Sequence, residues 1–199
     1  MRLAIPLIAS FAALITPVVC SAQESTDKLP AGEIASCMLT RLDADNDGKV
    51  SPADVIASAR KATESDSDRD GVVSPLEEYA YASAFLEAVL AADTNGDGVS
   101  DKAELTVWVE ALHSGKLMPC SERNCEVRAE LLAKLADKDS DGEIAPTEMR
   151  PGFSSTTWNT NGDKILSTEE VRLALLAKFK AEREAILLMT NIPGQPSGN

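Results

Sequence analysis

Aromatic residues and positive charge are both scarce in this chain of 199 residues. Phe, Trp and Tyr make up only 4% of it, so a core must be built mainly from Leu, Val, Ile and Ala, which favours helices over strands. Lys and Arg number 19 against 32 Asp and Glu, and the net charge of −13 argues against nucleic acid or an anionic membrane surface as a partner. The hydrophobic fraction of 44% still allows a packed core, and we predict an all-α fold.

The common catalytic motifs are also missing. The single histidine, His113, forms no Cys–His pairing pattern, and the sequence contains neither Gly-x-Ser-x-Gly nor a phosphate-binding loop. Carboxylates are abundant, but the repeat described below accounts for them. We therefore expect a protein that is not an enzyme.

Only one long apolar run is present, and it lies at the N-terminus. Residues 3–15 follow Arg2 and are almost wholly apolar, and small residues precede Gln23. The run is shorter than the roughly 20 residues that cross a bilayer, and it is typical of an export signal that is cleaved after Ala22. An N-terminal core helix and a lipoprotein acylated at Cys20 are the alternatives. We predict an exported protein, periplasmic or secreted, without a membrane span.

Five segments of twelve residues repeat one pattern of oxygen-bearing side chains: loop 1 (43–54), loop 2 (66–77), loop 3 (93–104), loop 4 (137–148) and loop 5 (159–170). Asp or Asn stands at positions 1, 3 and 5, an acid stands at position 12, and the first four loops carry Gly at position 6. Calcium takes about six to eight oxygen ligands, and glycine permits the sharp bend that gathers them. The expected ligands, including backbone carbonyl groups at position 7, are Asp43, Asp45, Asp47, Lys49 and Asp54; Asp66, Asp68, Asp70, Val72 and Glu77; Asp93, Asn95, Asp97, Val99, Asp101 and Glu104; Asp137, Asp139, Asp141, Glu143 and Glu148; and Asn159, Asn161, Asp163 and Glu170.

These loops resemble the calcium loop of the EF-hand superfamily, and the resemblance spans residues 32–190. It implies helix–loop–helix units, loops that pair through a short β bridge at position 8, and folding or shape change linked to calcium. The close loop spacing is similar to that of lanmodulin, an exported bacterial lanthanide binder whose loops carry proline at position 2. Position 2 here is Ala44, Ser67, Thr94, Lys138 and Thr160.

The leading functional prediction is a non-catalytic calcium-binding module with a structural or buffering role. Two alternatives are selective lanthanide binding and a calcium sensor that binds an unidentified protein partner. A sensor needs a Met-rich groove that opens on binding, whereas the four methionines after residue 22 are widely scattered.

The five loops are predicted to differ in strength. Loops 2 and 3 have the most complete ligand sets, and loop 4 has Ala145 where a side chain could hold a water. Loop 1 ends in Asp54, which is one methylene shorter than Glu and shifts the preference towards Mg²⁺. Loop 5 begins with Asn159 and has Lys164 at the glycine position, so we expect weak binding or a structural role beside loop 4.

The short gaps between loops predict shared helices. A single helix over residues 52–65 would be about 21 Å long, and another would join loops 2 and 3. Loops 1 and 2 would then lie at opposite ends of a helix and could not pair. Pairing of loop 1 with loop 3 is one solution, which the sequence leaves open.

We expect two lobes joined by a linker. The predicted order is a signal peptide (1–22), an N-terminal region (23–113), a connecting segment (114–125), a C-terminal region (126–190) and a disordered tail (191–199). Cys120 and Cys125 are close enough in sequence for a local disulfide, which export would permit. Cys37 is then left as a small buried hydrophobe, although a bond from it to either of the others stays open.

Overall fold

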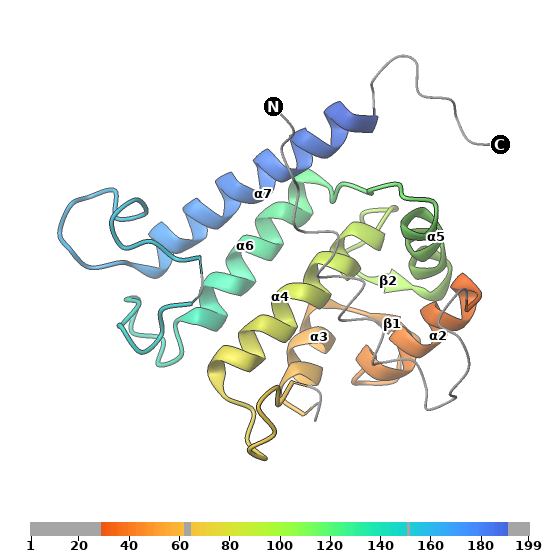
Figure 1. Cartoon of the computed structure of the whole chain (residues 1–199), viewed down its shortest axis with the longest axis horizontal. Helices are drawn as coiled ribbons and strands as arrows, with labels where there is room; N and C mark the ends of the chain where they lie inside the picture. The colour runs from red at the N-terminus through yellow and green to blue at the C-terminus, as the bar shows by residue number, and fades with distance from the viewer. Residues whose placement is uncertain (1–28, 62–64, 151, 191–199) are drawn as a thin grey trace.

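The computed structural model describes residues 29–61, 65–150 and 152–190, so the predicted signal peptide and C-terminal tail lie outside the described residues. The described part is mostly helical, which confirms the coarse prediction of an all-α chain (Figure 1). No helix within it is long and apolar enough to cross a membrane. The elements are α2 (Ala31–Leu42), β1 (Lys49–Val50), α3 (Pro52–Ala59), α4 (Pro75–Ala92), β2 (Ser100–Asp101), α5 (Lys102–His113), α6 (Glu122–Ala136) and α7 (Thr168–Thr190).

Three helices begin inside the acid-rich loops through the same capping box. Position 9 is the N-cap, and its side chain accepts a hydrogen bond from the backbone N–H of position 12. The position 12 carboxylate accepts in return from the N-cap N–H, so two donors that the helix leaves unpaired are satisfied. The pairs are Ser51 with Asp54, Ser74 with Glu77, and Asp101 with Glu104.

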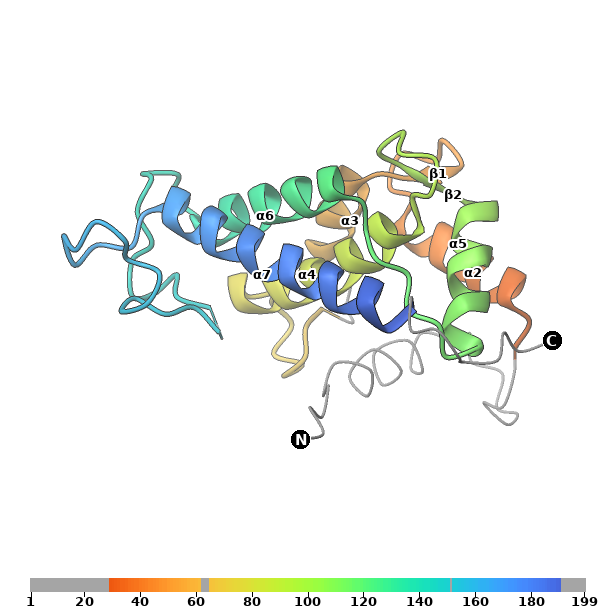
Figure 2. The same cartoon turned by 90° about the horizontal axis from the view of Figure 1, so that it is seen from above.

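α4 lies at the centre of the molecule. It contacts α3, α5 and α6, while α2 packs on α5 and α6 packs on α7 (Figures 1 and 2). Leu86, Val89 and Leu90 of α4 are at most 1% exposed, as are Leu105 of α5 and Leu132 of α6. Each such side chain contributes roughly 1.5–3 kcal/mol when it is buried, so aliphatic contacts along α4 stabilise the arrangement.

The prediction of one long helix over residues 52–65 is wrong, because α3 ends at Ala59. The residues after Ala59 are mostly polar and offer no apolar face to bury, and Arg60 instead forms an ion pair with Glu78 of α4 at 2.7 Å. α3 is therefore about 12 Å long at 1.5 Å per residue. The helix predicted between loops 2 and 3 does form without a break, as α4.

Two pairs of loops are joined by β contacts. β1 and β2 are antiparallel, with Val50 opposite Ser100, so loop 1 pairs with loop 3. A bridge between Glu143 and Ser167 joins loop 4 to loop 5 at the opposite end of the molecule (Figures 1 and 2). Loop 2 takes part in no strand or bridge among the described residues.

The three described cysteines are thiols. Sγ of Cys120 lies 3.0 Å from Sγ of Cys125, across the N-cap of α6. Burial, followed by the neighbouring Cys125, raises the pKa of Cys120 to about 12, so this thiol is protonated at neutral pH. The predicted disulfide is not formed in this structure, and Cys37 is partly rather than fully buried.

Candidate metal sites

All five loops share one backbone conformation. Positions 4 and 6 have positive φ angles in every loop, which turn the chain twice around a common centre. Glycine occupies position 6 in the first four loops, but Lys164 adopts φ 70° at that position in loop 5. A non-glycine residue pays about 1–2 kcal/mol for this conformation. Loop 5 bears this cost at position 6, whereas loops 1, 2 and 4 bear it at position 4, through Asn46, Arg69 and Ser140.

Backbone N–H groups orient the side chains at positions 3 and 5. In loop 2, the N–H of Asp70 donates to Asp68 Oδ1 at 3.1 Å, and the N–H of Val72 donates to Asp70 Oδ1 at 2.8 Å. The equivalent two bonds form in the other four loops. The backbone therefore presents the same oxygen-bearing positions in every loop.

The position 12 carboxylate closes each loop. In loop 2, Glu77 Oε1 accepts from the N–H of Ser67 at 2.6 Å, and Oε2 accepts from the N–H of Ser74 at 2.9 Å. The Ser74 N–H, followed by the hydroxyl groups of Ser67 and Ser74, lowers the pKa of Glu77 to about 2. The N–H groups of Ser167 and Thr160 likewise lower the pKa of Glu170 to about 2. Both carboxylates are therefore fully charged at neutral pH.

Loop 1 closes less tightly. Its shorter Asp54 accepts from the position 2 N–H of Ala44 at 3.3 Å, whereas the corresponding distances in loops 2 to 5 are 2.6, 3.0, 2.7 and 2.7 Å. The missing methylene thus limits how far Asp54 reaches back across the loop.

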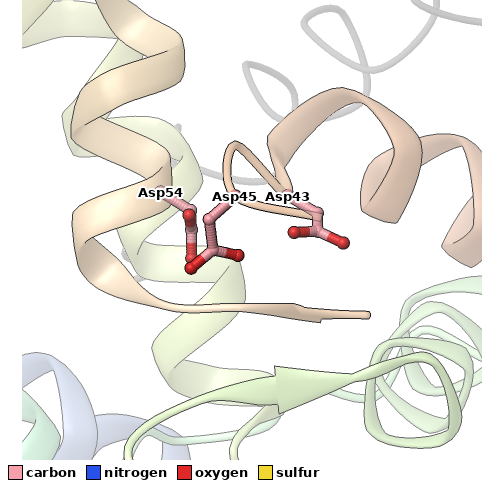
Figure 3. Close-up of side chains that lie close together, drawn as sticks. All are labelled: Asp43, Asp45 and Asp54. Atoms are coloured by element: carbon pink, nitrogen blue, oxygen red, sulfur yellow. The ribbon is translucent and has the colours of Figure 1, made fainter. Parts of the chain in front are cut away.

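Three loops gather carboxylates into clusters. In loop 1, one oxygen each of Asp43, Asp45 and Asp54 lie within 4.8 Å of one another, and Figure 3 shows the three carboxylates facing a common space. The N–H of Asp47 lowers the pKa of Asp45, but desolvation and the neighbouring carboxylates outweigh this effect and raise it overall. Mutual repulsion is thus built into the cluster. The clusters in loops 2 and 4 are Asp66, Asp68 and Asp70, and Asp137, Asp139 and Asp141.

Loop 4 contains a buried oxygen atom without a hydrogen-bond partner. Asp137 is 7% exposed, and its Oδ2 accepts from the N–H of Gly142 at 3.1 Å. Its Oδ1 is buried and accepts no hydrogen bond. A buried polar atom left unsatisfied in this way costs about 1–3 kcal/mol, and a cation bound in the cluster would satisfy it. The oxygen-only donor set, with four acids at side-chain ligand positions in each of loops 1 to 4, fits a hard cation such as Ca²⁺.

Loops 3 and 5 have an amide at position 3. In loop 5, Asn159 Nδ2 donates to the Ile165 carbonyl oxygen at 2.9 Å, and Asn161 Nδ2 donates to Asp163 Oδ2 at 2.9 Å. These amides already satisfy oxygens that would otherwise face an ion, including the position 7 carbonyl. In loop 3, Asn95 makes a similar but longer contact with Asp97, at 3.3 Å.

Three contacts around the loops were not foreseen from the sequence. Lys49 Nζ of loop 1 lies 3.7 Å from Asp97 Oδ2 of loop 3, which follows from the β1–β2 register. The N–H of Val99, with smaller contributions from Asn95 and Lys49, lowers the pKa of Asp97 despite desolvation. The other two contacts place Asn124 on loop 3 and Thr168 on loop 4.

Comparisons with protein-family models, with curated proteins and with solved structures find no match to this chain, so the sites rest on its own sequence and geometry.

Proposed function

We propose that this protein is a non-catalytic calcium-binding module of the EF-hand type that binds Ca²⁺ at loops 1 to 4. The observation that carries the proposal is the buried Asp137 Oδ1, which lacks a partner inside a cluster of three carboxylates. The same backbone scaffold recurs in all five loops, and loops 1 to 4 combine it with four acidic side chains at ligand positions, which supports one shared use for these four. Loop 5 has self-satisfied amides and acts as the structural partner of loop 4.

Ion binding would act mainly on stability. Carboxylates within 4.8 Å of one another repel, and a divalent cation among them removes that repulsion. An ion that binds only the folded chain stabilises it by RT ln(1 + [L]/Kd), which is about 2.7 kcal/mol at 100 times Kd. Extracellular modules bind calcium at roughly 10⁻⁴–10⁻³ M. With the expected export, this range favours a structural or buffering role over sensing.

Isothermal titration of the metal-free chain with Ca²⁺, Mg²⁺ and La³⁺ tests the proposal. We expect three or four calcium sites, with Mg²⁺ competing best at loop 1 because Asp54 is short. Glu77→Gln and Glu104→Gln should each delete one site. Glu78→Gln makes the same change in charge beside loop 2 and should delete none.

One outcome would favour a different metal, and another would refute metal binding. Lanthanum binding that exceeds calcium binding by several orders of magnitude beyond the effect of charge would favour a lanthanide protein. Absence of both binding heat and any change in melting temperature with Ca²⁺ would refute metal binding altogether.

A further inference from the structure

The first aspartates of loops 3 and 4 each receive a hydrogen bond from a distant part of the chain. Asn124 of α6 donates through Nδ2 to Asp93 Oδ2 at 3.2 Å and to the carbonyl oxygen of Leu90 at 2.9 Å. Thr168, the first residue of α7, donates through Oγ1 to Asp137 Oδ2 at 2.6 Å. Each donor lies 31 residues beyond the aspartate that it contacts.

Loops 1 and 2 have no such support within the described ranges. The side chain of Asp43 accepts only from the N–H groups of Asp47 and Gly48, which belong to its own loop. Asp66 of loop 2 accepts in the same way from its own positions 5 and 6. Both aspartates are partly exposed, whereas Asp93 is 5% exposed and Asp137 is 7% exposed.

Asn124 and Thr168 each donate to the Oδ2 atom of their aspartate, which also accepts a hydrogen bond from within its own loop. Oδ2 of Asp93 also accepts from the N–H of Gly98, at 3.0 Å, and Oδ2 of Asp137 accepts from Gly142. Two donors on one oxygen restrict rotation of the carboxylate, which leaves Oδ1 of Asp137 held in place but unpartnered. Outer partners of this kind orient metal ligands before the ion arrives.

We propose that Asn124 and Thr168 are positioning residues for ion binding, which hold the first aspartates of loops 3 and 4 in their binding orientation. This inference rests on the proposed function. It makes ion affinity at loop 3 depend on the docking of α6, and affinity at loop 4 depend on the start of α7.

The surrounding contacts support this coupling. Asn124 is 2% exposed, and its neighbour Arg123 donates to the carbonyl oxygen of Gly96 in loop 3 at 3.3 Å. Thr168 stands at position 10 of loop 5, so loop 5 supports loop 4 without an ion of its own. Because coupling free energies are reciprocal, an ion in loop 3 also stabilises the packing of α6 against this loop.

The test is a calcium titration of the metal-free chain, followed by the backbone amide resonances of Gly71, Gly98 and Gly142. Each of these amides donates to the first aspartate of its loop, so each reports one site. Asn124→Ala should weaken calcium binding at loop 3, reported by Gly98, about tenfold and should leave binding at loop 4, reported by Gly142, unchanged. Thr168→Val, which keeps the shape and removes the hydroxyl, should do the reverse. Each variant is the control for the other, because a general loss of folding would weaken both sites together.

Conservative variants sharpen the test. Thr168→Ser keeps the donor and should restore affinity at Gly142. If Asn124→Ala does not fold, Asn124→Asp can replace it. This variant keeps the size but sets a carboxylate against Asp93, and it should weaken calcium binding at loop 3, reported by Gly98, more strongly. A change below about twofold, or an equal loss at every loop, would overturn the inference. If none of the amides responds to calcium in the unaltered chain, the proposed function fails instead.

Discussion

Loops 2 and 4 carry nearly the same ligands but lie in different surroundings. Both have Asp at positions 1, 3 and 5, Gly at position 6 and Glu at position 12. Loop 4 is bridged to loop 5 and has a buried Asp137, whereas loop 2 has no bridge among the described residues and leaves Val72 66% exposed. If the loops bind ions as we propose, we infer that ligand spacing determines whether a loop can hold an ion and that neighbouring elements determine how strongly it binds. From the sequence loop 2 ranks above loop 4, and the structure leads us to expect the opposite order.

The largest expected difference between these loops comes from neutralising their first aspartates. Asp137→Asn should raise the stability of the metal-free chain by about 1 kcal/mol, because it replaces one of three clustered carboxylates by an amide that can donate to the other two. Asp66→Asn, at a more exposed site, should change it by less than about 0.5 kcal/mol. Both variants should lose calcium binding at their own loop. Urea unfolding with and without calcium measures both effects, and equal changes in the two metal-free variants would remove the distinction between the loops.

A smaller effect is expected where loop 5 departs from the others. Lys164→Gly removes the strain of a positive φ of 70° and adds glycine's own entropic cost of about 0.5–1 kcal/mol. The net gain in stability should be about 0.5 kcal/mol, measured by urea unfolding without metal. Lys138→Gly, at a loop 4 position that does not need a positive φ, is the matched control and should destabilise the chain.

The position 12 carboxylates and the clustered carboxylates should affect stability in opposite directions as the pH falls. The pKa of Glu77 is lowered to about 2, so its contribution to stability is present above about pH 4.5 and is lost as pH falls towards 2. Glu77→Gln should flatten this part of the metal-free stability curve. Asp68 acts in the opposite direction: the N–H of Asp70 favours its charged form, but desolvation and the neighbouring Asp70 and Glu77 carboxylates raise its pKa overall. Asp68→Asn should therefore steepen the decline, as followed by circular dichroism, and an unchanged profile in both variants would count against these assignments.

The smallest effect concerns the ion pair between loops 1 and 3. Lys49 and Asp97 side chains are 46% and 43% exposed, so Lys49→Gln should cost less than about 0.5 kcal/mol of metal-free stability. It should also raise calcium affinity at the Gly98 reporter slightly, because Lys49 no longer competes for Asp97. Lys116→Gln makes the same charge change outside the loops. If it raised calcium affinity at Gly98 equally, the gain would be a general effect of charge and not of the Lys49–Asp97 pair.

Local patterns in the sequence predicted local structure well. The helical class is confirmed, because helix formation and its start at residues such as Ser51 and Ser74 are decided by neighbours in sequence. The predicted length of the helix that begins at Pro52 was wrong, because the end of a helix depends on the apolar surface available for packing. Pairing of loop 1 with loop 3 depends on how α4 and α5 pack, so it stayed open. Asn124 and Thr168 were missed because each lies 31 residues from its aspartate and neither stands at a ligand position of the repeat.

The central claim is tested most directly by titrating calcium into the unaltered, metal-free chain while the amides of Gly71 and Gly142 are observed in one sample. Both resonances should shift and saturate, with Gly142 reaching its midpoint at the lower calcium concentration. No shift of either resonance at calcium concentrations on the order of 10⁻² M, well above the range of known extracellular modules, would contradict the account.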